Sequence, residues 1–269
     1  MAECSHPTDI RFALRAVLID GLKFLGLVAL LSWLLYRGST DLGYNWQWYQ
    51  VPKYLGRMTA EGFQPGPLLL GLGVTLKVTG ASFGLTFLIG LVTALLRLSG
   101  SPVASLVARV YMEAIRNTPL LVQLFFIYFV FAPIVGLGAF ASAVLALSLF
   151  EGAYASEIFR AGIVSIERGQ WEAAMSLGMT RAQCYRHVIL PQAVRRILPP
   201  LTSQAVSLVK DSALVSTIAI YDLTMRGQAI IAETFLTFEI WFTVAAMYLV
   251  LTLALSALSH GLERRLRPA

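Results

Sequence analysis

Polar and ionisable side chains are scarce in this chain, and several of them interrupt long apolar stretches. Gln123 lies in an apolar run a few positions after Pro119, Glu151 precedes Tyr154 by three positions, and the triplet Lys210-Asp-Ser212 breaks another run. Charged and polar groups at membrane depth are costly, so they usually face a partner helix or a pathway. These residues are therefore the candidates for contacts with a polar solute.

The signs of the charges suit a solute that carries both an amino and a carboxylate group. Lys210 can attract a carboxylate, whereas Glu151 or Glu157 can receive an amino group. A helix that is broken at membrane depth also aims its half-helix ends at a charged ligand. We therefore expect a pathway lined by polar residues of the apolar stretches, namely Thr118, Gln123, Glu151, Tyr154, Lys210 and Ser212.

The same residues also have structural interpretations. Glu157 and Arg160 are three positions apart, and we expect them to pair with each other. An ion pair with a partner subunit explains Lys210 and Asp211 as well as a solute contact does. A hydrogen bond between helices explains Gln123 equally well. The sequence leaves both interpretations open for these three residues.

Several chemistries are excluded by the motifs. The chain has no GxxxxGK[ST] phosphate loop, no HExxH zinc motif and no GxSxG nucleophile elbow. Its two cysteines, Cys4 and Cys184, show no metal-binding spacing. An intramembrane enzyme would need a catalytic pair, but Glu151 and Glu157 do not share a helix face. We expect no catalytic residue, no metal site and no cofactor in this chain.

The elements that position these residues are membrane helices. The chain has 269 residues, 57% hydrophobic and 13% charged, whereas a soluble domain carries about a quarter charged residues. A helix crosses the hydrocarbon core with roughly 20 apolar residues. We expect an all-α integral membrane protein with six crossings, near residues 16–36, 67–96, 104–133, 139–163, 196–221 and 240–259. Glycines 71, 73, 80, 84 and 90 are expected to permit tight helix packing.

Most basic residues fall on one side of these helices. Six crossings place both termini on that side, which the positive-inside rule makes cytoplasmic. The net charge of +6 then reflects loops and not nucleic acid binding. Residues 37–66 lie outside, where Trp46, Trp48 and Tyr49 suit an interfacial belt or a docking surface for an outside partner. No small-x-small cleavage site follows residues 16–36, so we expect a retained anchor and not a signal peptide.

The loop at residues 165–195 is too structured for a simple connector. Residues 166–177 form a predicted short helix, and Gly178 follows as a left-handed cap. Ala173 and Ala174 permit close approach by another surface. From these features alone, the loop is either a docking element or an amphipathic hairpin on the membrane.

A second short helix completes this loop. Thr180 and Gln183 have the spacing of a capping box. Pro191 is expected to end the second helix. The pattern predicts a helix, a glycine turn and a helix.

This loop resembles the EAA loop of bacterial binding-protein-dependent ABC importers. The elements that match are Glu172-Ala-Ala, Gly178 and Ile189-Leu-Pro191, in that order. Arg116-Asn-Thr-Pro-Leu-Leu-Val-Gln123 and Leu208-Val-Lys-Asp-Ser-Ala-Leu214 resemble the polar amino acid branch of the family. The resemblance implies a five-helix type I permease core over residues 67–263. Outside this core lie a cytoplasmic N-terminus (1–15), an extra transmembrane helix (16–36), an external segment (37–66) and a cytoplasmic tail (264–269).

The resemblance also implies partners in the bacterial inner membrane. A separate dimeric ATPase, which would bind the ATP and Mg, would contact the loop residues Glu172, Ala173, Ala174, Leu177, Gly178, Ile189 and Pro191. A second permease chain, identical or paralogous, and a periplasmic amino-acid-binding protein would complete the complex. The stretches at 210–214 and 45–48 favour glutamate or aspartate as substrate, with glutamine or a basic amino acid as the alternative. An ion channel, the other membrane class considered, would have no use for the structured loop.

Overall fold

The computed structural model describes residues 8–41, 43–60 and 62–266. The chain divides into two compact units, one up to residue 47 and the other from residue 48 onward. The first unit consists mainly of α1 (Thr8–Asp41), whose stretch Ile19–Gly38 is apolar enough to cross a membrane. The predicted N-terminal segment 1–15 lies partly outside the described residues, and the rest of it belongs to α1. Residues 267–269 of the predicted tail also lie outside them.

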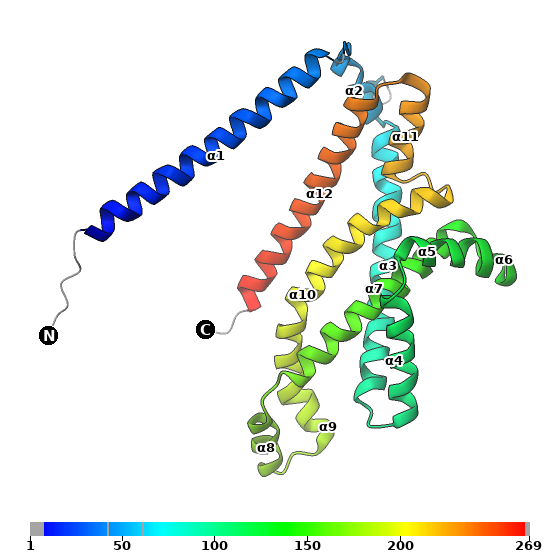
Figure 1. The fold of residues 1–269 in the computed structure, drawn as a ribbon. Coiled ribbons are helices and arrows are strands. Elements are labelled where there is room, and N and C mark those ends of the chain that lie inside the picture. The colour runs from blue at the N-terminus through cyan, green and yellow to red at the C-terminus, as the bar shows by residue number, and fades with distance from the viewer. Residues whose placement is uncertain (1–7, 42, 61, 267–269) are drawn as a thin grey trace. The chain divides into compact units, whose positions relative to one another are not determined.

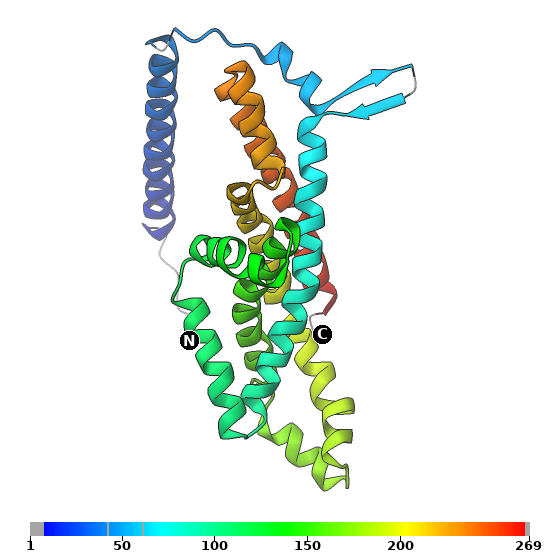
Figure 2. The ribbon, with the colours of Figure 1, turned by 90° about the vertical axis from the view of Figure 1, so that its right-hand side faces the viewer.

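The second unit begins with short elements and then enters a long helix. These are the 3-10 turn η1 (Trp48–Gln50), α2 (Pro52–Leu55), the antiparallel hairpin of β1 (Gly56–Thr59) and β2 (Gly62–Pro65), and α3 (Pro67–Leu98). The all-α prediction holds apart from this hairpin. Figure 2 shows the hairpin projecting from the N-terminal end of α3.

Four helices in the described residues are long and apolar enough to cross a membrane, and a bent pair makes a fifth. Besides α1, they are α3, α7 (Ala139–Val164) and α12 (Thr237–Leu266). The expected crossing at 196–221 has a different form. It is α10 (Leu190–Asp211), an amphipathic helix of 22 residues that packs against α7 and α12 and continues as the 3-10 turn η4 (Ser212–Ile218).

The prediction of one straight helix over 104–133 is wrong. The chain forms α4 (Pro102–Arg116), then bends by 105° into α5 (Leu120–Phe125), the π-helix η2 (Phe126–Phe131) and α6 (Ala132–Val135). Pro119 causes the break, because a proline disfavours helical backbone at the residue before it.

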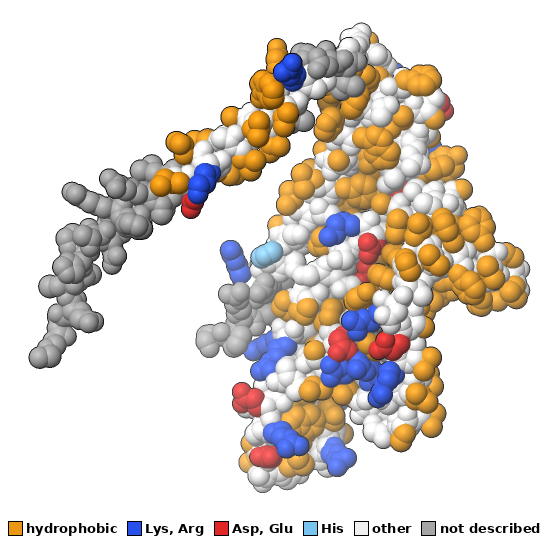
Figure 3. Space-filling view, viewed as in Figure 1, with side chains coloured by type: hydrophobic (Ala, Val, Ile, Leu, Met, Phe, Trp, Pro, Cys, Tyr) orange, Lys and Arg blue, Asp and Glu red, His pale blue; other side chains and the backbone are white. Residues whose placement is uncertain are grey.

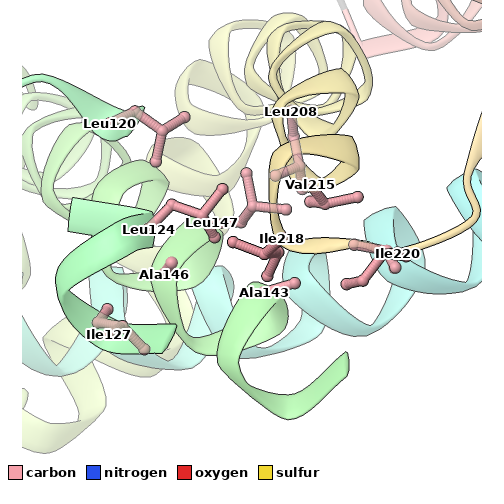
Figure 4. Close-up of a cluster of buried hydrophobic side chains, with 11 residues drawn as sticks. Leu120, Leu124, Ile127, Ala143, Ala146, Leu147, Leu208, Val215, Ile218 and Ile220 are labelled. Carbon is pink, nitrogen blue, oxygen red and sulfur yellow. The ribbon is translucent and has the colours of Figure 1, made fainter. Parts of the chain in front are cut away.

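The helices of the second unit enclose an apolar core around α7. Figure 4 shows the side chains of this cluster, among them Leu124 of α5, Leu147 of α7 and Ile218 of η4. Each of these three side chains is 2% exposed or less. Ser148 of α7 donates to the Ser82 carbonyl of α3 at 3.1 Å. The core therefore fixes α3, α5, α7 and η4 against one another.

The predicted tight packing at glycines is confirmed at two positions. A Cβ on Gly90 would lie 2.8 Å from the Ala155 Cβ of α7, and one on Gly71 would lie 2.8 Å from the Asp222 carbonyl oxygen. Glycines 73, 80 and 84 have nothing within 4 Å of that position, so the prediction is wrong for packing within this chain.

Three elements connect α7 to the body of α10. They are α8 (Arg168–Ser176), α9 (Arg181–Cys184) and the π-helical turn η3 (Tyr185–Ile189). The prediction that Pro191 ends the second helix is wrong, because α9, η3 and α10 follow one another without a break. A π-turn interrupts the regular hydrogen-bond ladder, which accommodates the missing N–H of proline. The remaining helix, α11 (Leu223–Thr234), lies at the opposite end of this unit from α8 and α9 (Figure 1).

Candidate functional site

The turn after α8 has the geometry of a Schellman motif. Gly178 has φ +76°, and its N–H donates to the Met175 carbonyl at 2.9 Å. The N–H of Met179 donates to the Ala174 carbonyl at 3.2 Å. This pair of bonds satisfies carbonyls that a helix end leaves free, and it needs a left-handed residue. The predicted role of Gly178 as the cap is confirmed.

The second half of the loop is held by its own cap and by contacts to its neighbours. Thr180 and Gln183 form the predicted capping box, with the Thr180 N–H donating to Gln183 Oε1 at 2.9 Å. The rings of Trp171 and Tyr185 pack edge to face at 4.7 Å between centroids. The loop is therefore a rigid hairpin of helices.

The loop residues named from the sequence separate into a surface group and a buried group. The surface group is exposed and comprises Glu172, Ala173, Leu177, Gly178 and Pro191. Glu172 also lines a hollow of about 520 Å³ together with Arg168 and Trp171. Ala174 and Ile189 are buried, and Ile189 belongs to a core cluster with residues of α3, α7 and α10. The buried pair holds the loop in place, and the surface group is what a partner would meet.

The charge distribution distinguishes this end of the unit. On the face drawn in Figure 3, Lys and Arg side chains gather toward the end that carries α8 and α9. Arg168, Arg181 and Arg186 lie on the loop itself. A basic, protruding and rigid element suits contact with another protein.

A second group of candidates surrounds Glu151 on α7. Glu151 is 1% exposed and accepts a hydrogen bond from Gln204 of α10. The carboxyl group of Asp211 is close enough to Glu151 to act on it electrostatically. Two neighbouring carboxylates repel each other unless a proton or a cationic group lies with them. This site is therefore suited to an amino group.

A cavity of about 490 Å³ adjoins this acidic pair. Gln204 and Tyr154 line it together with Arg116 and Arg196. The guanidinium of Arg116 lies over the Tyr154 ring, 5.3 Å from its centroid. Gln204 therefore connects this cavity to Glu151, and Arg116 and Arg196 contribute positive groups to the cavity wall.

The predicted pairing of Glu157 with Arg160 is confirmed. Glu157 also accepts from Arg97 at the end of α3. One carboxylate therefore joins α3 to α7, and the two arginines neutralise its charge although Glu157 also lines the cavity.

Gln123 and Thr118 line a different cavity, of about 620 Å³ and with mostly apolar walls. The Gln123 side-chain amide donates to the carbonyls of Ile115 and Thr118 at 2.7 and 3.0 Å, across the bend between α4 and α5. Its Oε1 is buried without a hydrogen-bond partner. In this chain Gln123 holds the bend, and its free acceptor faces the interior.

Lys210 and Ser212 lie apart from both cavities. Lys210 is exposed and forms no ion pair with any described residue, so the expected ion pair with a partner subunit stays a prediction. Ser212 is buried, and its hydroxyl donates to the Val209 carbonyl at 2.7 Å.

Sequence reasoning missed three of the cavity residues. Gln204, Arg116 and Arg196 were visible as polar residues beside apolar runs, but nothing in their spacing pointed to Glu151. Within the described residues, no three His, Cys, Asp or Glu side chains gather as metal ligands.

Apolar helices that bury polar side chains, together with a rigid basic hairpin at one end, define a multi-span membrane transport component. The sequence profile described as "Binding-protein-dependent transport system inner membrane component" matches residues 86–268. The chain therefore belongs to this family of transport-system membrane components, as the loop resemblance predicted, and it is not an enzyme.

Two curated relatives show how much of the chain is shared. The glutamine transport system permease protein GlnP of Escherichia coli K12 is 40% identical over 205 residues, which cover 75% of this chain and 94% of the relative. The L-cystine transport system permease protein TcyB of Bacillus subtilis 168 is 43% identical over 198 residues, covering 73% and 85%.

Two solved structures are similar to the fold. One, described as an amino acid ABC transporter with histidines, has a TM-score of 0.73 at 40% identity and covers 82% of this chain and 100% of its own. An inward-facing MetNI methionine ABC transporter has a TM-score of 0.63 at 22% identity, covers 75% and 96%, and supports the fold alone. These matches confirm the type I permease fold class.

Proposed function

We propose that this chain is the membrane-spanning subunit of an ATP-driven importer for polar amino acids. The observation that carries the proposal is the Schellman-capped loop α8–α9, which protrudes from the end of the helices that bury Glu151. A separate ATPase docks on its surface group, namely Glu172, Ala173, Leu177, Gly178 and Pro191. ATP and Mg bind in that partner.

The buried acidic pair narrows the substrate class. Glu151 and Asp211 lie together with Gln204, which suits the amino group that all amino acids carry. A second acidic group in the substrate would add repulsion beside these carboxylates. We therefore favour a neutral polar amino acid such as glutamine over the glutamate or aspartate favoured by the sequence motifs. The names of the two relatives, for glutamine and cystine, support the same choice.

The proposed complex contains two permease chains, an ATPase dimer and a periplasmic binding protein in the inner membrane. Both termini face the cytoplasm, and η1, α2 and the β-hairpin face outward. Thr118 and Gln123 line the pathway from the bend, and Tyr154 lines it beside Glu151. Lys210 and Ser212 contribute at the end of α10, where Lys210 is free to meet the partner chain or the substrate carboxylate.

Uptake into liposomes tests the proposal. The chain is co-expressed with a candidate ATPase subunit, and the purified complex is reconstituted in liposomes with the ATPase side facing the compartment that holds ATP. We expect ATP-dependent accumulation of labelled glutamine in preference to glutamate, with none when the ATPase carries an inactivating substitution. Purification without any ATPase, or ion conductance without ATP, would contradict the proposal.

A further inference from the structure

The hairpin β1–β2 has two chemically different faces. In its register Met58 lies opposite Phe63, and the next pair along the ribbon is Arg57 opposite Gln64. Directly opposed residues share a face, and successive residues alternate between faces. Met58 and Phe63 therefore lie on one face, and Arg57 and Gln64 on the other. The hairpin is an amphipathic ribbon.

Nothing within the described residues covers the apolar face. Met58 is 84% exposed and Phe63 is 58% exposed. A two-stranded hairpin is marginally stable by itself in water. Its apolar face consequently calls for an apolar surface outside the chain.

The position of the hairpin indicates what that surface is. Strand β2 ends at Pro65, and the membrane span α3 begins at Pro67, so a single residue separates them. That residue is Gly66, whose N–H donates to the Leu55 carbonyl at 2.7 Å. Figure 2 shows the hairpin running crosswise to α3 from its end. A ribbon that runs crosswise to a membrane-spanning helix, and is joined to that helix by a single residue, lies along the membrane surface.

Cations and aromatic rings surround the base of the hairpin. Lys53 and Arg57 line a hollow of about 410 Å³ with Tyr54. Lys53 lies over the Tyr54 ring, with Nζ 4.8 Å from its centroid. Arg57 has no ion-pair partner in the described part of the chain. Such side chains place their stems on apolar surface and their charges at the level of lipid phosphates.

We propose that the β1–β2 hairpin is a membrane-surface anchor. Met58 and Phe63 enter the boundary between headgroups and acyl chains, while Lys53 and Arg57 bind lipid phosphate groups.

Spin labels on single cysteines test the anchor without requiring transport. In a chain with Cys4 and Cys184 changed to Ala, labels are placed at Met58 or Phe63, and at Thr59 or Gln64 as matched controls. The protein is reconstituted in vesicles of phosphatidylethanolamine and phosphatidylglycerol. Collisions with oxygen and with a water-soluble nickel chelate are then compared.

We expect the oxygen-to-nickel collision ratio to be several-fold higher for the apolar-face labels than for the control labels. Adding Arg57→Glu to the Phe63 label should move that ratio toward the control value. Equal nickel access for all four labels would overturn the proposal. Protection that arises only when a binding protein is added would also overturn it, because the face would then be a protein dock.

Discussion

Gln204 of α10 donates a hydrogen bond to Glu151 of α7, across 53 positions of sequence. The same two helices flank the α8–α9 loop, since α7 ends at Val164 and α10 begins at Leu190. A displacement of the loop by the ATPase would therefore act directly on the helices that hold the buried acidic group. If the chain works as proposed, this connection links the surface that would bind the ATPase to the buried acidic group that would meet the substrate.

Removing the charge of Glu151 tests its role in the pathway. Glu151→Gln keeps the shape and the contact to Gln204 but loses a charge-assisted hydrogen bond, which is worth about 1.5–3 kcal/mol. We expect assembly with the ATPase to be unchanged and uptake at limiting substrate to fall about tenfold or more. Initial uptake rates in proteoliposomes measure this effect. The control is Glu233→Gln on the exposed side of α11, which should not alter uptake, and equal rates for both variants would remove Glu151 from the pathway.

Substitutions of Gly178, which caps α8, test the effect of its backbone conformation separately from that of steric clashes. Gly178→Ala introduces no clash, since nothing lies within 4 Å, but it forces alanine to φ +76° at a cost of roughly 1–2 kcal/mol. We expect weaker ATPase binding and lower ATP-dependent uptake, with a smaller loss for Gly178→Asn because asparagine tolerates this conformation. Gly169→Ala in the same loop has neither constraint and should be neutral. Equal behaviour of the two alanine variants would contradict a role for the left-handed cap.

The clamp at the bend predicts a stability effect. Gln123→Leu removes the hydrogen bonds that join the end of α4 to α5, and it should lower the free energy of unfolding by about 1–3 kcal/mol. Thermal unfolding in detergent, followed by circular dichroism, measures the change. Val122→Leu, at an exposed neighbouring position, provides the control. An unchanged unfolding midpoint for Gln123→Leu would show that the bend is held by other contacts.

Because α3 packs closely on α7, valine substitutions at Gly90 and Gly84 of α3 should have different effects on stability. Gly90→Val would place side-chain atoms against Ala155 and should destabilise the folded chain by about 1–3 kcal/mol. Gly84→Val meets nothing within 4 Å in this chain and should be tolerated when the chain is isolated. Unfolding midpoints of the two variants provide the test. A loss at Gly84 that occurs only in the assembled complex would place a partner chain on that side of α3.

Local features were predictable from the sequence because their interactions lie within a few positions. The Schellman turn at Gly178, the capping box of Thr180 and Gln183, and the pair of Glu157 with Arg160 all depend on neighbours along one helix or turn. The apolar spans were predictable for a similar reason, since crossing a bilayer requires a continuous run of apolar residues. The sequence alone therefore determined the two caps of the α8–α9 loop and the class of fold.

Only the tertiary structure decided which polar groups meet. The contact of Gln204 with Glu151 depends on how α10 rotates against α7, and the periodicity of a single helix does not specify that rotation. The same holds for the bend that Gln123 secures and for the choice of Gly90 over Gly84 at a helix contact. In each case packing between distant segments outweighs local preference, since many buried contacts together exceed the small cost of one residue's conformation.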